Sequence, residues 1–180
     1  MSDLDPQALP AQDVIWIIGH AGHGKSTLLS AISRSRTNEG APSATRFAVI
    51  DPNQPPPERL KAAILLVSAA EGPMPQTRDH LILARQYGLT NVVVFLNKMD
   101  IADQSLVDLV EMEMRELLSM YGLRGDKATV VRGSAKKALE GDLSAPGEPA
   151  IRRLLAALGE GSPAADGAQA PGFLRRLFGF

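Results

Sequence analysis

Gly19–Thr27 reads GHAGHGKST, and this stretch decides the fold. It follows a short apolar run, VIWII at Val14–Ile18, and continues into a helix-forming segment, Leu28–Arg34. An all-apolar run of this length is typical of a strand covered on both faces. Gly19–Ser26 matches GxxxxGK[ST], a pattern that requires a strand before it and a helix after it. We therefore predict a phosphate-binding loop rather than a Gly-rich turn that merely begins a helix.

The chemistry of this loop follows from its residue types. Small residues let the backbone curl until successive N–H groups converge on phosphate oxygens, and the helix N-terminus adds partial positive charge. Lys25 supplies a point charge to the β- and γ-phosphates, and the Ser26 hydroxyl is placed to ligate Mg²⁺. His20 and His23 are three residues apart without a third ligand nearby, which makes a poor zinc site. We interpret both as loop residues with local hydrogen bonds.

The rest of the chain alternates strands with helices, which predicts an α/β fold with a mostly parallel sheet and helices on both faces. The further strands are expected at Phe47–Ile50, Ile64–Val67, Val92–Leu96 and Thr129–Val131. The further helices are expected at Pro75–Tyr87, ended by Gly88 as a C′ glycine, at Gln104–Tyr121 and at Ala150–Leu158. Residues 35–45 and 52–57 are expected to be loops. Ligands of such sheets bind at the carboxyl ends of strands.

Two short motifs stand at those strand ends. Asn97–Asp100 reads NKMD and closes the fourth strand. The Asp100 carboxylate can accept hydrogen bonds from N1–H and the C2 amine of guanine, whereas adenine would leave it unpaired. Lys98 can cover a ring face with its aliphatic stem, and Asn97 can brace the phosphate loop. Gly133–Lys136 (GSAK) follows the fifth strand, where a backbone N–H can bind guanine O6. The alternative for Asp100 is an ordinary helix cap.

These motifs resemble the G domain of bacterial elongation factor Tu. The resemblance covers residues 13–34 and about 62–142, including EGPMPQTRDHLILAR at Glu71–Arg85 and VVVFLNKMD at Val92–Asp100. It implies a three-layer P-loop NTPase G domain that binds GTP or GDP with Mg²⁺. The nucleotide contacts expected are Gly19, His20, Ala21, Gly22, His23, Gly24, Lys25, Ser26, Thr27, Asn97, Lys98, Asp100, Ser134, Ala135 and Lys136.

The chain departs from this family where the family senses and hydrolyses GTP. Gly22 replaces an Asp, and no counterpart of the switch I segment lies between Lys25 and Asp51. Thr37 or Thr45 could substitute for its threonine, although nothing aligns either of them with it. Asp51 matches the first residue of the family's D-x-P-G-H motif and is expected to hold Mg²⁺ through water. The glycine and histidine of that motif are missing, which leaves Gln54 as a weak candidate to orient water. Residues 51–61 are too few for most of the switch II helix.

Three hypotheses for function follow. The first is a guanine-nucleotide binder with slow GTP hydrolysis and weak discrimination between GTP and GDP, because the base and diphosphate motifs are intact while the γ-phosphate motifs are damaged. The second is a pseudo-GTPase scaffold that presents its C-terminal tail to a partner. The third is hydrolysis completed by a partner protein. No binding of aminoacyl-tRNA is expected, because the two β-barrel domains that hold it are absent from this sequence.

Composition bounds the remaining possibilities. The 180 residues carry a net charge of -1 and no Cys, so we expect one domain, no DNA binding, no disulfides and a cytoplasmic protein without a transmembrane segment. We assign residues 1–12 to a leader, 13–158 to the G domain and 159–172 to a Gly/Ala/Pro linker. Phe173–Phe180 (FLRRLFGF) forms an apolar, basic tail. A protein groove, an anionic membrane surface and the tail's own domain are its possible docking sites.

Overall fold

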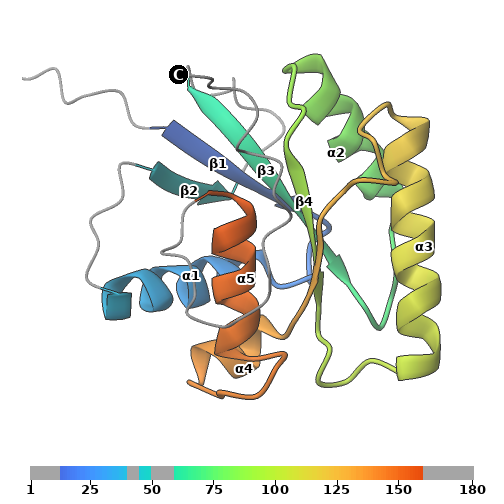
Figure 1. The fold of residues 1–180 in the computed structure, drawn as a ribbon. Helices are drawn as coiled ribbons and strands as arrows, with labels where there is room; N and C mark the ends of the chain where they lie inside the picture. Colours follow the sequence, from blue (N-terminus) through green and yellow to red (C-terminus); the bar gives the residue numbers. More distant parts are fainter. Residues whose placement is uncertain (1–12, 40–44, 50–58, 160–180) are drawn as a thin grey trace, which may run out of the picture.

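The computed structural model describes residues 13–39, 45–49 and 59–159. The expectations for Asp51, Gln54, the leader, the tail and all of the linker except Gly159 lie outside these residues. Within them, the chain forms one five-stranded sheet of order β2-β1-β3-β4-β5 in which every pairing is parallel (Figure 1). The strands are β1 Asp13–Gly19, β2 Thr45–Val49, β3 Leu60–Ser68, β4 Val92–Asn97 and β5 Val130–Arg132. All five predicted strands are confirmed.

The helices cover both faces of the sheet and give three layers (Figure 1). They are α1 Lys25–Glu39, α2 Pro75–Gln86, α3 Gln104–Met120, α4 Ala135–Leu139 and α5 Glu148–Ala157. Gly88 ends α2 with a φ of 68°, as a C′ glycine should. Among the helices in the described part of the chain, none has both the length and the apolar character needed to cross a membrane.

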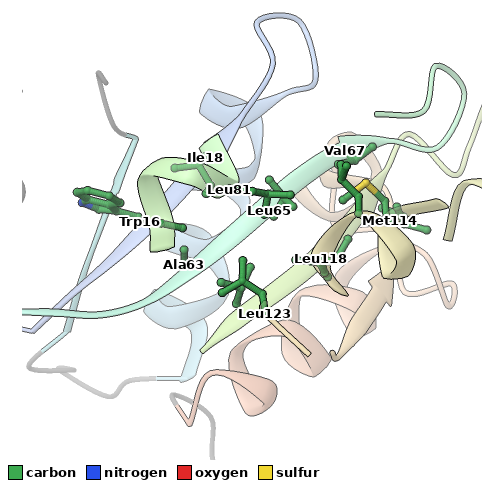
Figure 2. Close-up of a cluster of buried hydrophobic side chains, with 14 of the residues drawn as sticks. Trp16, Ile18, Ala63, Leu65, Val67, Leu81, Met114, Leu118 and Leu123 are labelled. Atoms are coloured by element: carbon green, nitrogen blue, oxygen red, sulfur yellow. The ribbon is translucent and has the colours of Figure 1, made fainter. Parts of the chain in front are cut away.

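β1, β3 and β4 carry continuous apolar runs, and their side chains point alternately to the two faces of the sheet. The protein therefore has two hydrophobic cores, one on each face. Trp16, Leu65 and their neighbours face α2 and α3, and this core includes Met114 of α3 (Figure 2). Ile15, Ile64 and their neighbours face α1, α4 and α5 on the other side. Because β1 and β3 are buried on both faces, their sequences lack the polar alternation of a half-exposed strand. The predicted α/β architecture is confirmed.

One local prediction was wrong, and one short helix was not predicted. Residues 35–45 were expected to be a loop, but α1 continues to Glu39. Its polar residues are accommodated because the hydroxyls of Ser33 and Thr37 donate to the carbonyl groups four residues earlier, at 2.9 Å in both cases. The short helix α4 was not predicted; Ser134 caps it by accepting a hydrogen bond from the N–H of Lys137 at 3.2 Å.

Candidate nucleotide-binding site

The phosphate-binding loop joins β1 to α1, and glycines shape it. Gly19 has a φ of 152°, and a Cβ there would lie 2.3 Å from the carbonyl oxygen of Leu66 on β3. Gly24 has a φ of 97°, and a Cβ there would lie 2.6 Å from Asn97 Nδ2. A larger residue at Gly19 would therefore push the loop off β3, and one at Gly24 would displace the Asn97 amide. The loop is held against β3 and β4, at the carboxyl edge of the sheet.

Lys25 lies at the first position of α1 and folds back over this loop. Its Nζ donates hydrogen bonds to the carbonyl oxygens of Gly19 at 2.7 Å and His20 at 3.1 Å. Partial burial lowers the pKa of the Lys25 ammonium group. The ammonium group thus lies over the strand-to-helix turn, where the pattern predicts phosphate binding.

His23 is a completely buried part of the same loop. Its Nδ1 lies 3.5 Å from the carbonyl oxygen of Leu66 and 3.4 Å from the backbone nitrogen of Ser68, so it can donate to the first or accept from the second. Its Nε2 makes no hydrogen bond but lies 3.5 Å from a carboxylate oxygen of Glu71. Burial lowers the pKa of His23, which favours a neutral ring. The His20 ring packs against it, with centroids 5.0 Å apart.

Asn97 links the loops that follow β1, β4 and β5. Only 4% of Asn97 is exposed. Its Nδ2 donates to the carbonyl oxygen of His23 at 2.8 Å, and its Oδ1 accepts from the backbone N–H of Ala135 at 2.8 Å. A single side chain therefore holds the phosphate loop next to the start of α4. The structure thus brings the Gly19–Thr27, NKMD and GSAK segments together at one edge.

Lys98 has an unusual backbone conformation for a residue with a side chain. Its φ is 64°, within the left-handed region. The flanking backbone holds it there, because Met99 N–H donates to Gly133 at 3.2 Å and Ile101 N–H donates to Lys98 at 3.1 Å. Its ammonium group pairs with the Glu71 carboxylate at 2.6 Å. The Lys98 hydrogen bond is the main cause that lowers the pKa of Glu71.

Asp100 is exposed in the turn after β4. The alternative interpretation made it a helix cap, but the cap of α3 is Asp103, whose side chain accepts from the N–H of Ser105 at 2.9 Å. The capping interpretation of Asp100 was therefore wrong. The described part of the chain contains no hydrogen-bond partner for the Asp100 carboxylate, which leaves both oxygens available to a ligand.

The GSAK segment offers fewer free backbone donors than its sequence suggests. The N–H of Ser134 donates to Pro146 at 2.6 Å, and the N–H of Ala135 is taken by Asn97. In this first turn of α4, the described residues provide no acceptor for the N–H of Lys136. Helix starts leave such donors unpaired. Lys136 therefore presents the free N–H of this segment.

The two threonines considered as substitutes for switch I lie far from Ser26. Thr37 is eleven residues beyond Ser26 along α1, about 16 Å at 1.5 Å per residue, and its hydroxyl donates to the carbonyl oxygen of Ser33. Thr45 pairs with Asp13 at the start of β1, the opposite end from the phosphate loop. The interpretation of either threonine as a stand-in for the switch I threonine was wrong, because α1 and β2 place these residues away from the loop. Asp51 and Gln54 lie outside the described residues.

Comparison with known proteins agrees with this geometry. A family model, the elongation factor Tu GTP binding domain, matches residues 57–163, which is more than half of the chain. The chain belongs to this family. The matched elongation factor Tu GTP binding domain region includes NKMD and GSAK, whereas Gly19–Thr27 precedes it. The assignment of the phosphate loop therefore rests on its own pattern, its strand-to-helix position and its contacts with Asn97.

Sequence reasoning missed two residues of this domain that the structure places beside the motifs. Glu71 contacts both His23 and Lys98. His80 of α2 lines a cavity together with Lys25. Both belong to Glu71–Arg85, a segment that was compared with elongation factor Tu only as a whole. Neither forms part of a short motif, so only the packing of α2 against the loop reveals them.

Proposed function

We propose that this protein binds GDP and GTP through the loops at the carboxyl edge of its sheet and hydrolyses GTP slowly or only with a partner. Membership in the family supports guanine-nucleotide binding. Lys25 and the loop N–H groups would hold the phosphates. Asp100 would pair with the guanine edge, and the N–H of Lys136 would donate to O6. The shortened region between α1 and β3 is the reason to expect slow hydrolysis.

The observation that carries this proposal is the pair of hydrogen bonds made by Asn97. They join the phosphate loop to the start of α4 at 2.8 Å each. Asp100 follows three residues later with its carboxylate unused by the helix cap. One nucleotide spanning these loops would meet a cation at one end and an acceptor at the other.

Ser26 fits the expected Mg²⁺ ligand. Ser26 is exposed in the first turn of α1, next to Lys25. Hydroxyl and phosphate oxygens are the hard donors that Mg²⁺ prefers. When bound, the ion would neutralise part of the phosphate charge. Asp51 stays a prediction for a second contact through water. We retain cytoplasmic localisation as part of the same proposal.

A pseudo-GTPase scaffold is the second candidate. Lys25 and Lys98 each have partners within the protein, namely the loop carbonyls and Glu71, so the fold does not need a ligand to satisfy these cations. Under this candidate, Phe173–Phe180 would bind a protein partner. Deleting residues 173–180 would then abolish partner capture while leaving the unfolding midpoint of the domain unchanged.

Calorimetric titration with GDP, GTP and ATP tests nucleotide binding directly. We expect GDP and GTP to bind with similar affinity and ATP to bind at least a hundredfold more weakly, because a buried unpaired edge is costly. Preference for ATP would contradict the guanine assignment. No binding of any nucleotide would favour the pseudo-GTPase scaffold.

The variant Asp100→Asn sharpens this test. Its amide donates where the carboxylate accepts, so it should lose GDP affinity by at least tenfold and gain affinity for xanthosine diphosphate, whose C2 carbonyl accepts. Asp126→Asn is the matched control, because Asp126 is exposed in the connection between α3 and β5. An equal loss of GDP affinity in both variants would contradict the role of Asp100.

A further inference from the structure

A cavity of about 430 Å³ lies between the phosphate loop and α2. Ala21 and Lys25 line it from the loop and the start of α1, and Gln76, Asp79 and His80 line it from α2. Lys25, which would contact the terminal phosphates, therefore lines the same cavity as polar side chains of α2. No motif in the sequence assigned a role to these side chains.

His80 is the half-buried member of this set, whereas Gln76 and Asp79 are exposed. Its Nδ1 is buried without a hydrogen-bond partner in the described part of the chain. Buried polar atoms are usually paired, so an orphaned imidazole beside a cavity calls for an explanation. The packing of α2 fixes the residue, because its neighbours Leu81 and Ala84 are fully buried.

Burial and the charges around His80 favour a neutral ring. Burial is the main cause that lowers its pKa, and the nearby Lys25 and His20 act in the same direction, while Asp79 opposes them. A neutral imidazole has one nitrogen that accepts a proton or a hydrogen bond. His80 thus has the protonation state that a water-activating base requires at neutral pH.

We propose that His80 is a catalytic residue for GTP hydrolysis in this protein, holding the attacking water in the cavity beside Lys25; this rests on the function proposed above. The water oxygen forms a bond to the γ-phosphorus while the bond from that phosphorus to the β–γ bridging oxygen breaks. The electron pair of the broken bond leaves with GDP. The proton lost by the water passes to the imidazole of His80, which returns it to the released phosphate.

Single-turnover hydrolysis of GTP by His80→Ala, His80→Gln and the wild type tests this role. We expect His80→Ala to lower the rate at least tenfold while the Kd for GDP changes less than twofold. His80→Gln should retain part of the rate, because an amide can orient water but cannot take its proton. Gln86→Ala, an exposed position at the end of α2, is the matched control.

A second readout does not depend on turnover. The NMR resonances of the His80 imidazole should shift when a non-hydrolysable GTP analogue binds. They should not shift when GDP binds. Equal hydrolysis rates in the wild type and His80→Ala, or GTP binding without any hydrolysis by the wild type, would overturn the role of His80 and leave guanine-nucleotide binding standing. Failure to bind either nucleotide would overturn both proposals.

Discussion

Glu71 contacts the Gly19–Thr27 loop and the NKMD motif at the same time. One carboxylate oxygen accepts from Lys98 Nζ at 2.6 Å, and the other lies 3.5 Å from His23 Nε2. The Ser68 hydroxyl adds a third contact at 3.3 Å. Glu71 therefore fixes the Lys98 side chain, whose stem we propose as a cover for the guanine ring.

Replacing Glu71 by Gln should weaken GDP binding modestly. The side chain is 42% exposed, so the ion pair with Lys98 is screened by solvent and is worth no more than about 1 kcal/mol, or about fivefold in Kd. Titrations at low and high salt check this, because the difference from the wild type should shrink as salt rises. Glu116→Gln, an exposed change on α3, should have no effect at either salt concentration. A salt-independent loss would contradict the ion-pair argument.

At the scale of elements, three loops meet because parallel strands end at one edge. β1, β4 and β5 deliver Gly19, Asn97 and the residues before Ser134 to that edge. Strand geometry alone leaves the loops free to move relative to one another. The buried Asn97 amide fixes them, since its donor and its acceptor are each used by a different loop.

The variant Asn97→Ala should therefore lose both stability and affinity. It leaves the carbonyl oxygen of His23 and the N–H of Ala135 buried and unpaired, which costs about 1–3 kcal/mol for each group. Urea unfolding without nucleotide measures the stability loss, and GDP titration measures the affinity. Ser105→Ala, which removes one exposed hydroxyl at the start of α3, is the comparison. A variant of Asn97 that kept full affinity would show that the loops need no bridge.

At the scale of the whole molecule, the buried His23 and the half-buried His80 predict how stability depends on pH. The pKa values of His23 and His80 lie below the ordinary value near 6.5, mainly because burial disfavours the charged ring. The unfolded chain therefore binds more protons than the folded one just below that pH. Their contribution to stability is complete above pH 6.5 and is lost as pH falls from there towards the folded pKa values.

The free energy of unfolding should accordingly fall between pH 7.5 and pH 5.5. The slope is at most about 1.4 kcal/mol per pH unit for each proton taken up. Urea titrations of the wild type, His23→Gln and His80→Gln at both pH values check this, and each variant should show a smaller pH dependence. An unchanged slope in His23→Gln would show that folding does not change the pKa of this ring.

Much of this fold was predictable because its information is local. The continuous apolar runs of β1, β3 and β4 are buried on both faces. They can therefore be recognised as strands without knowing which strands they pair with. Gly88 marked the end of α2 because the left-handed backbone conformation at that position favours glycine. The length of α1 was missed because its polar C-terminal part is stabilised by hydroxyl-to-backbone bonds that hydrophobic periodicity does not reveal.

The sequence by itself determined the α/β class, the phosphate loop and the NKMD and GSAK segments, because each depends on residues that are neighbours in the chain. Only the tertiary structure decided that Asn97 joins the loops, that Asp103 rather than Asp100 caps α3, and that Thr37 and Thr45 are carried away from Ser26. It alone placed His80 of α2 at the cavity beside Lys25. These are relations between segments far apart in the chain, set by strand order and helix packing.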